Sequence, residues 1–338
     1  MEFWLDIAAF ALKAGLIVAA LGLLIIVVIR ATRSGEAEAD ELKITSINDH
    51  YDDLQAQLNS QVLDKKALKA LRKARKKEAK ANPVPEDRKR LYLLEFEGDI
   101  KASAVEQLGN QIDALLTQAR KGIDEVVVRV DSPGGTVNGY GLAAQQLLRI
   151  RHAGVKLIVC VDQVAASGGY LMACTADRIL AAPFAIVGSI GVVAQVPNLH
   201  RLLKKNDIDY EEITAGEFKR SVSLLGEITP AGREHFREKL DATHIAFKDF
   251  VGQNRPNLDL AKVSNGDYWY GSEALALGLV DELMASDEYL FSARNEAQMF
   301  HVTTDEKKPL LRQIMEGLGF ALDAVAGRLW RASAPGGR

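Results

Sequence analysis

The sequence has few cysteines: only Cys160 and Cys174 occur in a chain of 338 residues. Both lie in apolar stretches, so we interpret them as buried free thiols rather than as a disulfide. No CxxC pair and no His/Cys cluster occurs, so we expect neither a metal site nor a cofactor. Positive charge is not in excess, because the formal net charge is -3 at pH 7. The charge balance therefore gives no indication of nucleic-acid binding.

The N-terminus carries a long apolar run. Residues 7–29 are apolar except for Lys13, which makes the run long enough to cross a bilayer. Glu2 and Asp6 stand where a cleaved signal peptide would carry basic residues. We therefore predict an uncleaved, single-pass membrane anchor over residues 1–30. Basic residues after the run favour a cytoplasmic location for the rest of the chain.

Residues 31–89 form a charged, helix-prone linker region. Its stretch from residue 64 to residue 80 begins with Asp64. The nine Lys or Arg residues that follow are accompanied by only one acidic residue, Glu78. Contact with anionic lipid headgroups and a solvated linker helix are equally good interpretations. The sequence Asn-Pro-Val-Pro at residues 82–85 then breaks the helix, and we place a domain boundary after it.

From residue 90 to residue 295 strand and helix patterns alternate. Strand-like runs occupy residues 91–96, 125–130 and 156–161, and helical spacing occupies residues 104–120, 139–151 and 230–250. This alternation predicts an α/β fold with a largely parallel sheet and helical crossovers. Functional sites in such sheets form at the carboxyl ends of the strands.

Two glycine-rich loops follow predicted strands. The first is Asp-Ser-Pro-Gly-Gly-Thr at residues 131–136, and the second is Ala-Ala-Ser-Gly-Gly-Tyr at residues 165–170. Ser167 lies where a strand gives way to a helix, whose N-terminus favours an anion. That location suits a nucleophile whose reaction builds an oxyanion. An ordinary helix N-cap and a tight turn are the alternative explanations of the two loops.

A nucleophilic serine needs a base. None of the six histidines lies in a glycine-rich or strand-end motif, so a Ser-His-Asp triad is poorly supported. A lysine can replace histidine where burial lowers its pKa. Lys219 follows a short predicted strand at residues 210–213, although it is otherwise one surface lysine among many.

Three segments together resemble the signal peptide peptidase SppA family of membrane serine proteases. They are the two glycine-rich loops and the Gly-Glu-Phe-Lys-Arg-Ser segment at residues 216–221. The apolar N-terminus, the basic linker and residues 182–191 narrow the resemblance to the SohB branch of that family. The resemblance implies a ClpP/crotonase-like fold and a Ser-Lys dyad. It assigns Ser167 as nucleophile, Lys219 as general base, Ser189 as the residue that orients the lysine, and Gly135 and Gly168 as oxyanion donors.

The function implied by the resemblance is that of a membrane-anchored serine endopeptidase of the bacterial inner membrane. Its polypeptide substrates would be signal peptides or membrane and envelope polypeptides, and its partners the lipid bilayer and further copies of the chain. Relatives are placed on the outer side of the membrane, whereas the basic residues favour the inner side, so the side stays open. The alternatives are a crotonase-fold enzyme acting on acyl-CoA and a catalytically inactive membrane scaffold.

Two further stretches bear on the architecture. Residues 179–196 carry no charge, but Pro183, Gly188 and Gly191 interrupt them, so we predict buried strand rather than a second membrane span. Residues 296–338 read as an amphipathic C-terminal tail with helical spacing from residue 310 to residue 330. Assembly, membrane contact and packing on the chain's own domain are all compatible with that tail.

Overall fold

A computed structural model describes residues 41–81, 87–216 and 218–305. The predicted anchor at residues 7–29 and the predicted tail helix at residues 310–330 lie outside these described residues. Within them, no helix combines the length and the apolar character needed to cross a bilayer. A compact unit extends from Lys43 to Thr303, which is wider at both ends than the predicted domain at residues 90–295.

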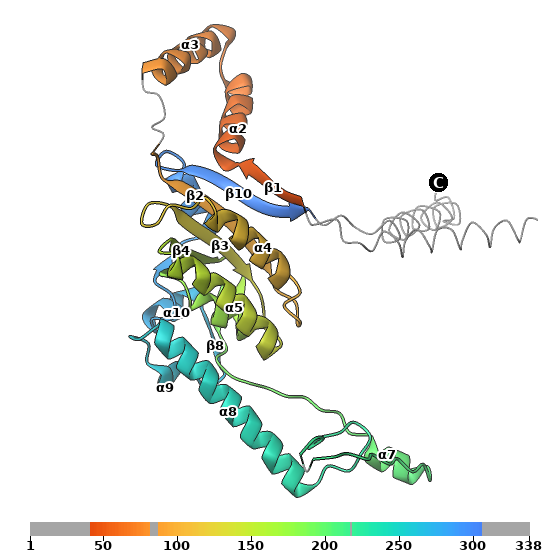
Figure 1. Ribbon diagram of the computed structural model, residues 1–338. Helices are drawn as coiled ribbons and strands as arrows, with labels where there is room; N and C mark the ends of the chain where they lie inside the picture. Colours follow the sequence, from red (N-terminus) through yellow and green to blue (C-terminus); the bar gives the residue numbers. More distant parts are fainter. Residues whose placement is uncertain (1–40, 82–86, 217, 306–338) are drawn as a thin grey trace, which may run out of the picture. The chain divides into compact units, whose positions relative to one another are not determined.

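A seven-stranded sheet lies at the centre of this unit (Figure 1). Its strands, in spatial order, are β1 (Glu41–Ser46), β10 (Gln298–Asp305), β2 (Arg90–Glu97), β3 (Glu125–Asp131), β4 (Lys156–Val161), β6 (Arg178–Ala181) and β9 (Glu282–Leu283). From β10 to β9 every neighbouring pair is parallel. The predicted α/β fold with a mostly parallel sheet is therefore confirmed, and the three predicted strands are β2, β3 and β4.

Helices cover both faces of this sheet, which explains why its central strands β2, β3 and β4 are mostly apolar rather than strictly alternating. Helices α4 (Val105–Leu116) and α5 (Val137–His152) lie side by side on one face (Figure 1). The apolar positions of α4 are buried at helical spacing, as predicted. On the other face, Leu290 of α11 (Ser286–Ala293) packs into the core, and Ile47 and Tyr51 of α2 (Ile47–Val62) pack against it.

A smaller sheet carries the predicted nucleophile turn. It consists of β5 (Val164–Ala166), β7 (Ile186–Gly188) and β8 (Tyr268–Tyr270), in that order. Strands β5 and β7 are parallel, whereas β7 and β8 are antiparallel. Helix α6 (Gly168–Ala173) follows β5, so one residue, Ser167, separates strand from helix.

The uncharged stretch at residues 179–196 forms strands β6 and β7, which confirms the strand prediction for its first part. Its last part does not fit the prediction, because residues 189–196 are irregular. Val193 is 80% exposed there and Val196 41%. No described strand pairs with these residues, and an unpaired segment has no sheet in which to be buried.

The chain between β7 and α8 makes little contact with the core. Helix α7 (His200–Lys205) has no buried residue. The predicted strand at residues 210–213 is wrong, because these residues are irregular and Ile213 is 88% exposed. The segment reads Tyr-Glu-Glu-Ile, and a short strand forms only beside a partner. No described strand pairs with these residues.

The remaining helices connect these parts of the unit. Helix α8 (Pro230–Asn254) confirms the predicted helix and begins with Thr229 as N-cap and Pro230 in the first turn. The N-terminal linker contributes α3 (Lys65–Ala81), and α9 (Leu260–Val263) and α10 (Gly271–Ala276) flank β8.

Candidate active site

Ser167 occupies a strained turn. Its backbone has φ 52° and ψ −115°, a conformation that L-residues rarely adopt. The Ser167 N–H donates to the Gly188 carbonyl at 2.8 Å, which ties the turn to β7. The side chain makes no N-cap hydrogen bond, so the ordinary capping explanation fails. A strained strand-to-helix turn with an uncommitted, partly exposed hydroxyl is the arrangement that nucleophile elbows use.

The Pro-Gly-Gly loop lies directly beside this turn. The Ser132 N–H donates to the Val164 carbonyl at 2.8 Å, and the Ala166 N–H donates to the Ser132 carbonyl at 3.0 Å. Gly134 has φ 89°, and a Cβ atom built on it would lie 2.7 Å from both the Gly168 nitrogen and the Ser167 Cβ. The two glycine-rich loops therefore face each other at one site.

The backbone N–H groups of Gly135 and Gly168 at this site have no acceptor among the residues that the structure describes. The N–H of Gly134, by contrast, donates to the Ser132 Oγ at 3.1 Å. Side chains would not fit at either free donor: a Cβ on Gly135 would lie 2.1 Å from the Ile100 carbonyl oxygen. Free donors next to a nucleophile can hold a developing oxyanion.

Ser189 follows the strand next to the nucleophile. In the β5–β7 pairing Ala166 lies opposite Gly188, so Ser167 and Ser189 leave the ends of paired strands. Ser189 also has a positive φ of 52°, and its N–H donates to the Asp267 carbonyl at 2.7 Å. Its hydroxyl donates only a long hydrogen bond, 3.5 Å, to the Gly266 carbonyl.

Lys219 is not brought to Ser167. Its side chain is exposed, and its backbone N–H closes a turn on the Gly216 carbonyl at 3.2 Å. No contact joins it to Ser167 or Ser189 within the described part of the chain. The neighbouring Phe218 stacks on His235 of α8 with ring centroids 4.0 Å apart, so α8 holds this segment.

No histidine contacts Ser167 in the described structure, although all six histidines lie within it. Both cysteines are buried free thiols, as the sequence predicts. Burial raises the pKa of the Cys160 thiol to about 12, so this group is not a reactive nucleophile.

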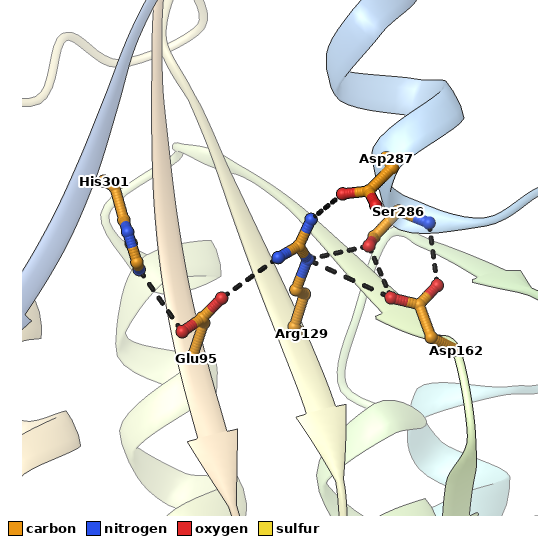
Figure 2. Close-up of polar contacts among 6 residues, drawn as sticks. All are labelled: Glu95, Arg129, Asp162, Ser286, Asp287 and His301. Carbon is orange, nitrogen blue, oxygen red and sulfur yellow. Dashed lines mark hydrogen bonds and ion pairs between the residues drawn. The ribbon is translucent and has the colours of Figure 1, made fainter. Parts of the chain in front are cut away.

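A charged cluster fixes the segment that leads from β4 to the nucleophile strand (Figure 2). Asp162 follows β4 and accepts hydrogen bonds from the N–H of Ser286 at 2.8 Å and from its hydroxyl at 2.5 Å. Arg129 donates to the same hydroxyl at 2.7 Å and pairs with Glu95 at 3.1 Å. The start of α11 is thereby clamped to the ends of β2, β3 and β4.

The sequence interpretation did not single out the buried residues behind the turn. Tyr140 of α5 is fully buried, and its hydroxyl lies 2.5 Å from the Ser132 Oγ. An aromatic side chain at helical spacing reads as core, so nothing in the local pattern distinguished Tyr140 from its neighbours.

Comparison with known sequences shows which protein family the chain resembles. The profile of peptidase family S49 matches residues 149–299, and the profile of the N-terminal region of that family matches residues 2–147. The probable protease SohB of Haemophilus influenzae is 44% identical over 311 residues, which cover 88% of this chain and 87% of that protein. The putative protease SohB of Buchnera aphidicola subsp. Baizongia pistaciae is 37% identical over 329 residues, covering 93% and 94%.

A solved structure also shows similarity to the chain. It is that of the 1510-N membrane-bound stomatin-specific protease in complex with a substrate peptide. The TM-score is 0.43 and the identity 16%, with 68% of this chain and 99% of that chain covered. The family profiles span most of the sequence, and the SohB relatives match it over nearly their whole length. The chain therefore belongs to peptidase family S49, as a SohB-like member, and is a protease.

Proposed function

We propose that this protein is a membrane-anchored serine endopeptidase with Ser167 as nucleophile and Lys219 as general base. One observation carries the proposal. The Ser167 hydroxyl is free of hydrogen bonds in the described structure and stands on a strained turn beside the free N–H groups of Gly135 and Gly168. An acyl-CoA enzyme would use the same kind of oxyanion donors but would not need Ser167 or Lys219, and an inactive scaffold would need neither. Membership of a peptidase family disfavours both alternatives.

The proposed reaction is acyl transfer. The Ser167 Oγ attacks the peptide carbonyl carbon while its proton passes to the neutral amine of Lys219. The N–H groups of Gly135 and Gly168 hold the oxyanion, each contributing about 3 kcal/mol to the transition state. The protonated amine then gives its proton to the leaving nitrogen. Water activated by the same lysine hydrolyses the acyl-enzyme and frees Ser167.

The side chain of Lys219 must first be desolvated, because in water the lysine stays protonated and a protonated amine cannot accept a proton. The segment that carries it exposes many apolar side chains: Val193, Leu199, Leu202, Ile208, Ile213 and Phe218. Such a surface is unusual for a monomer and suits an interface between copies. We therefore propose a homo-oligomer in which this segment of one copy covers the site of the next and supplies its lysine. Ser189, beside Ser167, would then orient the amine.

The proposed substrates are apolar polypeptides such as signal peptides or membrane and envelope polypeptides. Three exposed aromatic side chains near the ends of β7 and β8 support this proposal. Phe184 is 84% exposed and contacts Tyr270, which also contacts Tyr268. Apolar surface next to the site favours an extended substrate that carries apolar side chains.

The direct test of the nucleophile is covalent labelling. A fluorophosphonate probe incubated with the detergent-solubilised full chain is expected to modify one residue, Ser167, as peptide mass analysis would show. The reason is that the reagent needs an activated hydroxyl beside oxyanion donors. Labelling spread over several surface serines, or no labelling of active protein, would contradict the proposal.

Membrane attachment rests on the apolar run at residues 7–29 and on the exposed lysines and arginines of α3 between residues 65 and 77. The full chain is expected in the membrane fraction of a bacterial cell even after an alkaline wash. A variant without residues 1–30 should move largely to the soluble fraction. Recovery of the full chain in the soluble fraction would overturn the anchor.

A further inference from the structure

A directed chain of hydrogen bonds runs behind the nucleophile turn. The Gly134 N–H donates to the Ser132 Oγ at 3.1 Å, and the Ser132 Oγ lies 2.5 Å from the Tyr140 hydroxyl. The Tyr140 hydroxyl in turn lies 2.8 Å from the carbonyl oxygen of Asp99. Ser132 and Tyr140 are both fully buried, so water does not compete for these bonds.

The direction of this chain follows from proton counting. A carbonyl oxygen can only accept, so the single phenolic proton of Tyr140 goes to Asp99. The Ser132 hydroxyl must then donate its own proton to the Tyr140 oxygen, which leaves its lone pairs for Gly134. Burial raises the pKa of Tyr140, which keeps the phenol protonated as this direction requires. Each hydroxyl has one possible orientation, so the loop is held in one position.

The ring of Tyr140 supports the other half of the site. A Cβ atom on Gly168 would lie 2.3 Å from the Cγ atom of Tyr140, so the ring packs directly against the backbone of Gly168. Gly98 provides the space for this arrangement, because a Cβ there would lie 2.2 Å from the Ser132 Oγ and 2.4 Å from the Tyr140 hydroxyl. Tyr140 thus contacts both glycine-rich loops: its hydroxyl contacts Ser132 in the first, and its ring contacts Gly168 in the second.

The peptide that carries the free N–H of Gly135 is fixed on both sides. On one side the Gly134 N–H is bound by Ser132, and on the other the Thr136 N–H donates to the Ile100 carbonyl at 2.8 Å. Without the bond to Tyr140, the Ser132 side chain could rotate about its Cα–Cβ bond, and the Gly134 N–H would lose the Oγ atom as a fixed acceptor. The direction of the Gly135 N–H would then be fixed only by the hydrogen bond of the next residue, Thr136, to the Ile100 carbonyl.

We propose that Tyr140 is a positioning residue that aligns the two oxyanion donors, Gly135 through Ser132 and Gly168 through its ring. This inference rests on the proposed function, since it assumes that these N–H groups hold the oxyanion formed at Ser167. Tyr140 does not touch substrate. It acts on the transition state because donors must already point to where negative charge develops.

Tyr140→Phe tests the inference, because it keeps the ring against Gly168 and removes only the hydroxyl. With an internally quenched peptide that has an apolar core, kcat of the full chain is expected to fall by about tenfold to a hundredfold. KM should stay within about twofold, because substrate binding in the ground state does not use the oxyanion donors. The rate of fluorophosphonate labelling at Ser167 should fall by the same factor as kcat.

Tyr289→Phe is the control. Tyr289 belongs to α11, outside both glycine loops, and its hydroxyl donates to the carboxylate of the buried Glu125. Both variants remove one phenolic hydroxyl and its hydrogen bond, but Tyr289→Phe should keep the wild-type kcat. If Tyr140→Phe does not fold, Ser132→Ala interrupts the same chain while leaving Tyr140 in place, and the same loss of kcat is expected.

The outcomes separate the inference from the proposed function. Equal kcat for Tyr140→Phe and Tyr289→Phe, with the wild type labelled at Ser167, would overturn the positioning role alone. A raised KM at unchanged kcat would also overturn it. A wild-type enzyme that is active yet never labelled at Ser167 would overturn the proposed function, and this inference with it.

Discussion

Ser167→Ala is expected to abolish peptide hydrolysis and to leave the protein folded. The substitution removes the only atom that attacks the carbonyl, and losses of about 10⁴-fold or more accompany removal of a serine nucleophile. The fold should survive, because the Ser167 side chain makes no capping hydrogen bond and alanine fits the same backbone. The measurements are hydrolysis of the quenched peptide and the thermal unfolding midpoint.

Ser292→Ala provides the control for this substitution. Ser292 is an exposed serine of α11 whose hydroxyl donates to the Tyr289 carbonyl at 2.7 Å. Its removal should change neither activity nor labelling. Hydrolysis by Ser167→Ala within a factor of ten of the wild-type rate would show that another residue attacks the substrate.

Lys219→Ala is expected to be as inactive as Ser167→Ala. The two residues act as one unit, so the double variant should be no worse than either single variant. Lys205→Ala is the matched control, because Lys205 is an exposed lysine in the last turn of α7 and therefore belongs to the same segment. If Lys219→Ala keeps activity while substitution of a histidine removes it, the base has been assigned to the wrong residue.

The proposal that neighbouring copies complete the dyad adds a stronger test. Ser167→Ala and Lys219→Ala chains, each inactive alone, should regain activity when they are co-expressed and assembled together. Random mixing in equal amounts would give about a quarter of the wild-type rate, since one site in four combines an intact serine with an intact lysine. An assembly that contains both chains but no activity would show that the dyad forms within one chain.

The central strands could be predicted because each contains a run of consecutive apolar residues. Strands β2, β3 and β4 are such runs, whereas helices α4 and α5 show helical spacing, and the alternation of the two patterns indicates a parallel sheet. The predicted strand at residues 210–213 is wrong, because this short Tyr-Glu-Glu-Ile segment has no described strand to pair with. The sequence analysis places the residues of β10 in the C-terminal tail. Their partner strand β2 lies far away in the sequence, and no local pattern indicates that pairing.

For the site, too, some features could be predicted from the sequence and others could not. The glycine-rich loops predicted the meeting of residues 134–135 with residues 167–168, because both loops follow parallel strands. The motif also identified Lys219 as a candidate, but its position depends on a segment with few buried side chains, which local sequence does not determine. The ring of Tyr140 can pack against Gly168 only because Gly168, the first residue of α6, has no Cβ atom. The sequence of α5 alone does not reveal this contact.

The pairing of β10 with β2 has a consequence for the synthesis of this protein. Gln298 lies opposite Arg90, so two adjacent strands of the finished sheet leave the ribosome 208 residues apart. A nascent chain that has reached β9 still exposes one edge of β2, and it lacks Met299 from the core around Leu91. Pairings of such sequence separation form slowly. Translation must therefore pass residue 298 before the central sheet can close, and until then its unpaired edge must be kept from aggregating.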